Sequence, residues 1–379
     1  MKNPFLTSGY DTPDHFCDRK TETDALIRNI KNQVSTTLFA IRRIGKTGLI
    51  RHTFQKIEKQ KNIKGIYVDI YPTRNLKEFS YALATAIYNK FPETQSIGKR
   101  AINFFRQLRP VITYDPLSGI PELSVETART FQPEKTIQQL FDFVDQQGIQ
   151  VVFAIDEFQQ ITTYPEKNTE AFLRTHIQTL KHTTFIFCGS NQTLMQEIFK
   201  GAKRPFYASC SHLSLNHIDS SEYAAFILHH FNSNKRKITP DAIHFILEWT
   251  LCHTFYTQFL CNRVFSSGLS NIVIEDVMSI CHQLHLEEEG TYFQFRNLLT
   301  EFQWTLLQAF ALEERVDKFF GKSFSGRYNL GPNSTLDRGI GSLLQKDLIQ
   351  KEIRDGSSYF SVSDKFFLRW LQRQPQTHK

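Results

Sequence analysis

The sequence predicts an α/β domain built on a parallel sheet, followed by a helical region and then a winged helix. Up to about residue 215, short apolar or β-branched runs alternate with helical patterns. Strands that are buried on both faces of a parallel sheet are apolar throughout, which is the pattern of these runs. After residue 215 apolar residues follow helical spacing, and two short strand patterns return only near the C-terminus.

The composition is that of an ordered globular protein with more than one domain. The chain has 379 residues, of which 40% are hydrophobic and 34 are Phe, and a domain typically takes about 100–200 residues. The formal net charge of +7 is too small to indicate nucleic-acid binding by itself. Neither a long apolar run nor a signal-peptide core is present, so we expect a cytoplasmic protein with no membrane association.

The first domain is expected to span residues 1–210. Five runs are predicted to form its parallel strands: Thr36–Ile41, Gly65–Ile70, Gln150–Asp156, Thr183–Cys188 and His212–Leu215. The long interval between the second and third runs exceeds one crossover, and it contains two alternating segments around a Pro116–Gly119 turn. This pattern predicts a β-hairpin insertion near residues 110–126.

Residues 211–290 are predicted to form a helical lid domain. Three stretches carry helical spacing: Ser220–Phe231, Thr239–Leu251 and Phe255–Phe265. Thr239 stands before a proline, the arrangement of an N-cap followed by proline at the first helical position.

Residues 291–379 are predicted to form a winged helix, from three helices followed by a two-stranded hairpin. The helical patterns are Glu301–Leu312, Phe319–Tyr328 and Asn333–Lys346, and the strand patterns are Ile349–Ile353 and Tyr359–Val362. We expect Asn333 or Ser334 to cap the third helix. Asp355-Gly356 joins the two strands, a strong hairpin signal.

The first strand runs directly into a predicted phosphate-binding loop. Its residues are Arg42, Arg43, Ile44, Gly45, Lys46, Thr47 and Gly48. In such a strand-to-helix turn, backbone N–H groups and the helix N-terminus cradle phosphate. Lys46 would neutralise the β- and γ-phosphates, and Thr47 would offer a hydroxyl to Mg²⁺. Ala40 replaces the first glycine of the motif, which narrows the backbone angles but removes no donor.

Two later strand ends carry further candidates. The apolar run before Asp156 and Glu157 places an aspartate where it can hold Mg²⁺ through water, and a glutamate where it can deprotonate the attacking water. An acidic strand end at the surface is the alternative, but nucleotide sites of open α/β sheets lie at such carboxyl ends. Ser190 and Asn191 follow the next strand and could sense the γ-phosphate, or could form an ordinary turn.

Together these motifs resemble the archaeal-type ATPases, relatives of the AAA+ and STAND nucleotide-dependent switches. The resemblance covers nearly the whole chain and rests on Asn3–Phe5, Phe16–Arg19 with Glu22, Arg42–Thr47, Ala154–Gln159, Phe187–Ser190, Arg204–Tyr207 and Val362–Leu371. It implies a P-loop NTPase fold of the AAA+ type. It also implies that Asp18 and Arg19 pack near the nucleotide base, with a capping and salt-bridge role as the alternative.

The resemblance further implies an arginine that completes the site from the same or a neighbouring subunit. Arg174 and Arg204 are the candidates, and surface salt bridges are their alternative role. Many family members have another arginine two residues after Tyr207, where this chain has Ser209. We therefore expect slow hydrolysis by a single subunit.

We predict an Mg²⁺-dependent ATPase with slow turnover, whose lid and winged helix move with the nucleotide state. A nucleotide-locked adaptor that retains ATP or ADP and signals through partners is one alternative, and a winged-helix DNA-binding regulator is another. Residues 291–379 carry a net charge of +4 and residues 211–290 a net charge of −5. These charges leave a DNA partner, a protein partner and a homo-oligomer as open possibilities.

Overall fold

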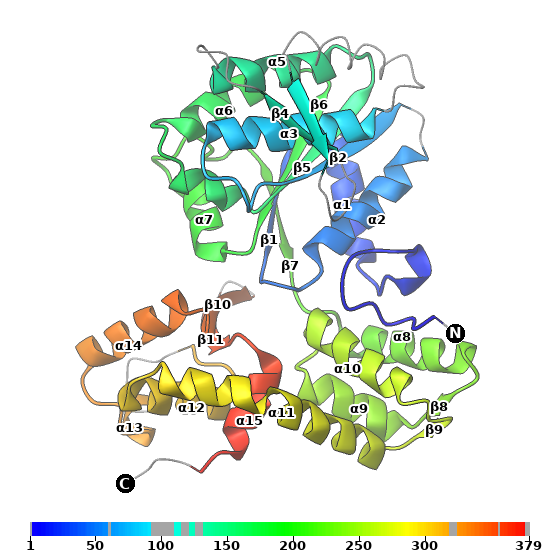
Figure 1. Cartoon of the computed structure of the whole chain (residues 1–379), viewed down its shortest axis with the longest axis vertical. Coiled ribbons are helices and arrows are strands. Elements are labelled where there is room, and N and C mark those ends of the chain that lie inside the picture. The colour runs from blue at the N-terminus through cyan, green and yellow to red at the C-terminus, as the bar shows by residue number, and fades with distance from the viewer. Residues whose placement is uncertain are drawn as a thin grey trace. The chain divides into compact units, whose positions relative to one another are not determined.

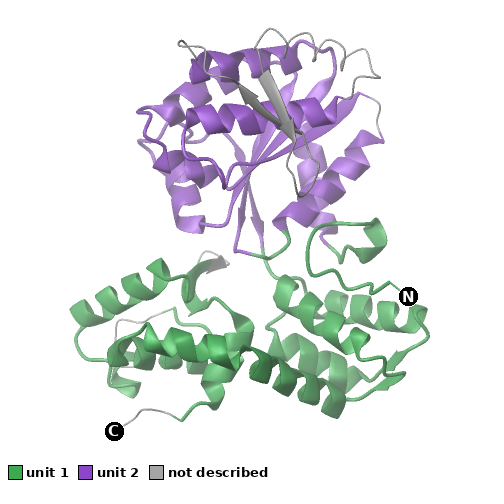
Figure 2. Ribbon diagram, viewed as in Figure 1, with its two compact units in different colours: residues 1–18, 43–45, 216–379 green, residues 19–42, 46–215 purple. Residues whose placement is uncertain are grey.

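The computed structural model describes residues 2–59, 62–91, 110–114, 121–125, 132–317, 324–354 and 357–375. The chain divides into two compact units (Figure 2). Unit 1 comprises residues 1–18, 43–45 and 216–379, and unit 2 comprises residues 19–42 and 46–215. Three residues of the phosphate-binding loop thus group with unit 1, while the strand and helix on either side of them belong to unit 2.

Unit 2 is built on a five-stranded parallel sheet with the order β2-β5-β6-β1-β7 (Figure 1). The strands are β1 Thr36–Ala40, β2 Ile63–Asp69, β5 Gln150–Asp156, β6 Thr183–Gly189 and β7 Ser211–Leu215. All five predicted strands are confirmed, with ends shifted by one or two residues. Strand β6 lies between β1 and β5. The carboxyl ends of these three strands carry the predicted site residues and are therefore neighbours in the sheet.

Helices pack against this sheet in two groups. The helices of unit 2 are α1 Lys20–Lys31, α2 Lys46–Glu58, α3 Leu76–Lys90, α5 Pro133–Asp145, α6 Thr169–Ile177 and α7 Gln192–Lys200, with a 3₁₀ helix η2 at Phe158–Thr163. Helices α3, α5, α6 and α7 share one core with alternate strand residues such as Phe153 and Phe187. Helices α1 and α2 pack on each other and contact the two edge strands. The intervening strand residues, such as Val152 and Ile186, are also buried, as expected for a sheet covered on both faces.

The predicted insertion contains two antiparallel strands, β3 Pro110–Tyr114 and β4 Pro121–Val125. The strands of the predicted hairpin are therefore confirmed. Its Pro116–Gly119 turn lies outside the described residues.

The first part of unit 1 is helical, as predicted. Its elements are the short 3₁₀ helix η1 Pro13–His15, helices α8 Ser220–Ser233, α9 Pro240–Trp249, α10 Thr254–Ser266 and α11 Ile274–Asn297, and the two-residue strands β8 Lys237–Ile238 and β9 Asn271–Ile272. The Thr239 side chain accepts a hydrogen bond from the backbone N–H of Ala242 at the start of α9, which confirms the predicted N-cap. Helix α11 runs continuously through residue 290, so the three-domain division at that residue stays a prediction.

The second part of unit 1 contains α12 Glu301–Glu313, α13 Phe324–Arg327, α14 Asn333–Gln345, β10 Ile349–Arg354, β11 Ser357–Val362 and α15 Lys365–Arg373. The antiparallel pair β10–β11 confirms the predicted wing strands, whereas the Asp355-Gly356 turn and residues 318–323 lie outside the described part. The predicted cap of α14 is wrong: Pro332 precedes the helix, which has no side-chain cap. Helix α15 was not predicted; Asp364 caps it by accepting from the N–H groups of Phe366 and Phe367.

Candidate nucleotide-binding site

The phosphate-binding loop connects the end of β1 to the first turn of α2. Gly45 has a φ of 104°, a backbone conformation that residues other than glycine rarely adopt. Helix α2 begins at Lys46, which is 7% exposed. A lysine and a helix N-terminus, the positive end of the helix dipole, therefore stand together, as anion binding requires.

Asp156 ends strand β5 and is held from three directions. Its Oδ2 accepts hydrogen bonds from the Tyr67 hydroxyl at 2.6 Å and the Thr47 hydroxyl at 3.4 Å. Its Oδ1 accepts from the backbone N–H of Glu157 at 3.0 Å. The carboxylate is therefore fixed in orientation beside the Thr47 hydroxyl.

Thr47 and Asp156 offer hydroxyl and carboxylate oxygens, the hard donors that Mg²⁺ prefers. Their separation of 3.4 Å brings them to the same small region, so the residues present fit a magnesium ion that keeps most of its water ligands. Over the described ranges, no cluster of three or more His, Cys, Asp or Glu side chains forms a separate metal cage. A phosphate-bound ion thus fits this donor set better than an all-protein metal site.

The Glu157 carboxylate is engaged on both oxygens. Its Oε2 accepts from the Ser190 N–H at 3.0 Å, the Ser190 hydroxyl at 2.8 Å and the Gln159 side-chain amide at 2.5 Å. Its Oε1 forms an ion pair with the Lys46 ammonium at 3.4 Å. Burial opposes ionisation of Glu157, but the Lys46 charge and these hydrogen bonds outweigh it and lower the pKa of the carboxyl.

A close approach of Gln159 to β6 makes this arrangement possible. A Cβ atom at Gly189 would lie 1.9 Å from the Gln159 side-chain oxygen, so a larger residue at this strand end would displace the Gln159 side chain. Glu157 itself adopts the left-handed conformation, with a φ of 56°, which is uncommon for a residue with a side chain. Local backbone geometry therefore turns the Glu157 carboxylate toward Lys46 and Ser190.

The sequence reasoning missed two residues on β2. Tyr67 donates to Asp156, and burial followed by the Asp156 charge raises the pKa of its hydroxyl, which keeps it protonated as a donor. Asp69 stands opposite Asp156 in the strand register. Its side chain is exposed, and partial desolvation, followed by the charge of Asp156, raises the pKa of its carboxyl. The order of strands in the sheet, which places β2 next to β5, is what brings these residues to the site.

The other predicted residues have different local roles. The Asn191 side chain caps α7 by accepting from the Leu194 N–H at 3.0 Å, whereas Ser190 contacts Glu157. Arg204 forms ion pairs with Glu170 at 2.6 Å and with Glu197 at 3.4 Å. Among the described contacts, neither Arg204 nor Arg174 forms an ion pair with Glu157 or Asp156. Any role for these two arginines at the γ-phosphate stays a prediction.

The residues predicted to pack near the nucleotide base lie at the start of α1. Asp18 is exposed, while Arg19 is 4% exposed and its guanidinium pairs with Glu22 at 3.1 Å. Both have left-handed backbone conformations. The salt bridge of the alternative interpretation is thus observed, whereas no side chain caps α1; contact with a base stays a prediction.

Within unit 1, the apex of the loop is attached to the N-terminus of α10. The Thr254 hydroxyl donates to the Ile44 carbonyl at 2.9 Å, and the exposed Arg43 guanidinium lies 4.7 Å from the centre of the Phe255 ring. Burial raises the pKa of Asp364, the cap of α15, and the Arg43 charge partly opposes this rise. Ile44 and Arg43 thus interact with the helical part of unit 1, and Arg43 also acts on its C-terminal part.

Comparisons with known proteins agree with this architecture. Residues 16–251 match the family model described as an ATPase domain predominantly from Archaea, and residues 290–373 match the model described as a probable winged helix domain. No curated protein sequence matches the chain. Over the described residues, no helix is both long and apolar enough to cross a membrane.

Two solved structures of similar fold come from archaea. A Walker-type ATPase of Pyrococcus abyssi is 16% identical, with a TM-score of 0.66 over 97% of this chain and 99% of that chain. The ORC2 protein of Aeropyrum pernix, solved as ADPNP and ADP complexes, is 13% identical, with a TM-score of 0.59 over 98% of this chain and 96% of that chain. These likenesses confirm the predicted P-loop fold with a C-terminal winged helix. By the family model that covers more than half of its length, the chain belongs to the ATPase family found predominantly in Archaea.

Proposed function

We propose that this ATPase acts as a slow, Mg²⁺-dependent nucleotide switch rather than as a fast motor. The proposal rests on the contacts of the Glu157 carboxylate, which accepts three hydrogen bonds and forms one ion pair. A general base is most effective when its pKa is near the working pH. These contacts lower the pKa of Glu157, so it would take a proton from water slowly until nucleotide rearranges them.

The roles of the other residues follow from their positions. Lys46 and the backbone N–H groups of residues 43–47 would hold the phosphates. Thr47, and Asp156 through water, would hold Mg²⁺, which when bound supplies charge neutralisation at the phosphate oxygens. Glu157 would orient the attacking water and receive its proton, as the bond from the γ-phosphorus to the bridging oxygen breaks to give ADP and phosphate.

The switch would be coupled to unit 1 through the loop apex. In this structure the Ile44 carbonyl contacts Thr254 and the Arg43 guanidinium contacts Phe255. Phosphate binding by the loop's backbone amides would change the loop conformation and would therefore alter these two contacts. ATP can shift a conformational equilibrium only by its differential affinity for the two states. These loop contacts are where such a difference could arise, because they involve both the phosphate site and unit 1.

A phosphate-release assay on Glu157→Gln tests the proposal. We expect measurable turnover in the parent below about 1 s⁻¹, the lower end of typical enzymes. The variant should lose turnover by about 100-fold or more, because an amide cannot accept the proton, while calorimetry should show retained ATP binding. Glu134→Gln, an exposed carboxylate on α5, is the matched control and should leave turnover unchanged.

Two results would count against this function. Turnover that survives in Glu157→Gln would show that another group takes the proton. A parent that retains ATP through purification without releasing phosphate would favour the nucleotide-locked adaptor. The switch itself predicts a change in tryptophan fluorescence on ATP addition, because Trp249, Trp304 and Trp370, the three tryptophans of the chain, all belong to unit 1.

A further inference from the structure

A second cavity, of about 960 Å³, lies within unit 1 and contains none of the nucleotide-binding motifs. It is lined mainly by one face of α8 and one face of α9, and its volume is at the upper end of the roughly 300–1,000 Å³ of small-molecule sites. Ala224 and Leu228 lie four residues apart on α8, and Ile243 and Leu247 lie four apart on α9. Residues at this spacing share a helix face, so each wall carries an apolar stripe.

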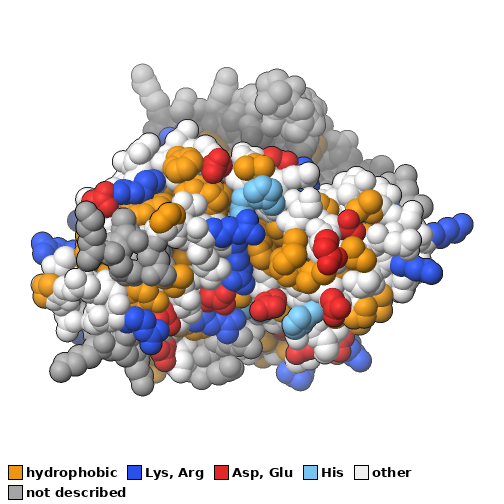
Figure 3. All heavy atoms as spheres, turned by 90° about the horizontal axis from the view of Figure 1, so that it is seen from below, with side chains coloured by type: hydrophobic (Ala, Val, Ile, Leu, Met, Phe, Trp, Pro, Cys, Tyr) orange, Lys and Arg blue, Asp and Glu red, His pale blue; other side chains and the backbone are white. Residues whose placement is uncertain are grey.

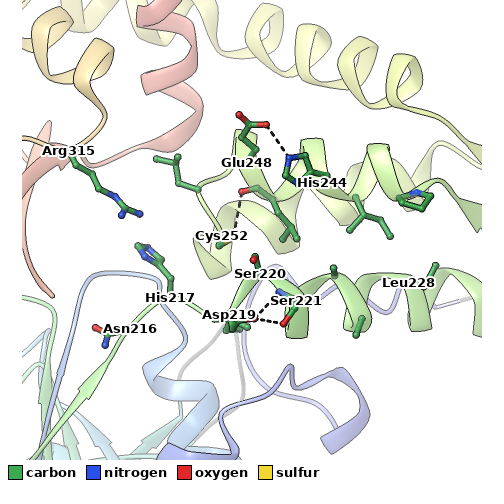
Figure 4. A pocket seen from close by; sticks show the side chains of 17 residues that line it. Asn216, His217, Asp219, Ser220, Ser221, Leu228, His244, Glu248, Cys252 and Arg315 are labelled. Atoms are coloured by element: carbon green, nitrogen blue, oxygen red, sulfur yellow. Dashed lines mark hydrogen bonds and ion pairs between the residues drawn. The ribbon is translucent and has the colours of Figure 1, made fainter. Parts of the chain in front are cut away.

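One end of this cavity is basic. Arg315 follows α12 and is exposed, with its guanidinium 5.5 Å from the centre of the Tyr359 ring. No described carboxylate forms an ion pair with it. Figure 4 shows Arg315 and His217 together at one end of the cavity and Leu228 at the opposite end.

The acidic side chains of the cavity, Asp219 and Glu248, interact with neighbouring residues of the same lining. Asp219 caps α8, accepting from the Ser221 N–H at 2.8 Å and from the Ser221 hydroxyl. The Glu248 carboxylate lies 3.8 Å from the His244 ring nitrogen. The lining thus holds two carboxylates and one guanidinium. Arg315 stands with His217 at the end opposite Leu228, and an anionic group would be attracted to this end.

We propose that this cavity binds an amphiphile with a single anionic head group, taken up from solution as a monomer. The apolar body would lie between α8 and α9, where Leu228 is still 41% exposed, and the carboxylate, sulfonate or phosphate head would pair with Arg315. Figure 3 shows a face of the molecule on which hydrophobic, basic and acidic side chains are interspersed. The inference is independent of the proposed ATPase cycle.

Such a ligand would contact two parts of unit 1 at once. Arg315 belongs to the segment that matches the winged helix, whereas the apolar walls come from the helical part. A ligand that touches both parts can bias their arrangement by differential affinity. The cavity is thus suited to receive a signal other than nucleotide.

Calorimetry on the full chain with three probes tests the proposal: decanoate, decan-1-ol and decyltrimethylammonium. We expect decanoate to bind saturably at one site, and Arg315→Gln to weaken it by about tenfold, the effect of losing one charge-assisted hydrogen bond. The affinity for decan-1-ol should stay nearly unchanged in this variant, and Arg315→Lys should restore part of the decanoate affinity. Arg28→Gln, which removes an exposed arginine of unit 2, should have no effect.

A second pair of variants tests the apolar wall. Leu228→Glu should weaken decanoate and spare decyltrimethylammonium, because the new charge repels one head group and attracts the other. Leu286→Glu, at an exposed leucine of α11 outside the cavity, is the matched control. Absence of saturable decanoate binding to the parent, or equal decanoate affinity in the parent and Arg315→Gln, would overturn the proposal. Circular dichroism of each variant confirms that the fold is intact.

Discussion

Two lysine–glutamate pairs in this protein have similar chemistry and different surroundings. In unit 2, the Lys46 ammonium lies 3.4 Å from Glu157, with side chains that are 8% and 17% exposed. In unit 1, the Lys365 ammonium lies 3.7 Å from Glu352, with side chains that are 2% and 6% exposed. The pairs therefore differ less in distance than in what else each partner contacts.

The Lys365–Glu352 pair is satisfied by its own neighbourhood. Glu352 accepts hydrogen bonds from the hydroxyls of Tyr359 at 2.5 Å and Ser361 at 2.7 Å, and Lys365 donates to the Val362 carbonyl at 2.8 Å and to Ser361 at 3.2 Å. Burial opposes ionisation of Glu352, but the Lys365 charge and these hydrogen bonds lower the pKa of Glu352 to about 2. Such a closed network stabilises one arrangement and leaves no capacity for a ligand.

Lys46 has a single described partner, Glu157, and it stands at a helix N-terminus beside Thr47 and Asp156. Its remaining donors are available to phosphate oxygens. The comparison indicates that the lysine of a buried ion pair at a functional site has N–H donors left for a ligand, whereas the lysine of a structural pair donates to groups of the protein itself. Substitutions at the two lysines should separate these roles.

Lys365→Met should produce the largest effect in the molecule. It leaves the Glu352 carboxylate buried without its cation, which typically costs about 3–5 kcal/mol of unfolding free energy. Urea denaturation followed by tryptophan fluorescence reports this loss, since all three tryptophans belong to unit 1. A double variant, Glu352→Leu with Lys365→Met, should be more stable than Lys365→Met alone, because no unpaired charge remains.

Lys46→Met should do the opposite. Glu157 is more exposed than Glu352 and keeps its hydrogen bonds from Ser190 and Gln159, so stability should fall less than in Lys365→Met. ATP affinity should fall by about 100-fold or more with the loss of a charged phosphate contact. Lys56→Met, at an exposed position of the same helix, is the control for calorimetry. A large loss of stability in Lys46→Met with ATP affinity intact would show that the Lys46–Glu157 pair serves the fold and does not bind phosphate.

The difference between the two pairs also shows what sequence reasoning can reach. Lys46, Thr47 and Asp156 were predicted because a motif fixes their spacing to a strand end, and parallel strands present those ends at one edge. The same reasoning predicted the five strands of the sheet and the wing strands of the C-terminal part. Local chemistry and periodicity therefore suffice where a motif sits at the end of a regular element.

Residues whose contacts join elements far apart in the sequence were not predicted. Tyr67 carries no motif, and its contact with Asp156 depends on the strand order, which the succession of elements along the chain leaves undetermined. Lys365 and Glu352 come from different elements, so their pairing had no sequence signal. For Asn191 the sequence left a phosphate sensor and an ordinary turn open, and the structure shows its side chain as a helix cap; all of these roles suit a polar residue after a strand.

Acid should distinguish the two glutamates. A carboxyl whose pKa is lower in the folded chain than in the unfolded chain stabilises the fold while it is ionised, and this contribution is lost as pH falls through the folded pKa. The pKa of Glu352 falls from an ordinary 4.5 to about 2, a difference that corresponds to about 3 kcal/mol present above pH 4.5 and lost toward pH 2. Unit 1 should therefore destabilise through this window.

Thermal unfolding between pH 5 and 3, monitored by tryptophan fluorescence, checks this expectation. Glu352→Gln should lower stability at neutral pH and flatten the decline in acid, because an amide does not titrate. Glu157→Gln should change the acid decline less, since Glu157 is more exposed than Glu352. An unchanged acid decline in Glu352→Gln would contradict the assignment of this carboxylate as ionised in the fold.

The smallest expected effect tests whether Tyr67 positions Asp156. Tyr67→Phe removes the 2.6 Å hydrogen bond to Oδ2 and leaves the bond from the Glu157 N–H to Oδ1. A hydrogen bond to a charged group contributes about 1.5–3 kcal/mol, but the proposed water-mediated Mg²⁺ contact would restrain Asp156 when nucleotide is bound. We therefore expect turnover to fall only about threefold to tenfold, with a larger Mg²⁺ requirement and unchanged ATP affinity without metal.

Tyr71→Phe, which alters an exposed tyrosine just past the same strand, should leave the Mg²⁺ titration unchanged. If Tyr67→Phe lowers the melting temperature but leaves that titration where it is in the parent, Tyr67 supports the fold of the sheet edge and does not position Asp156.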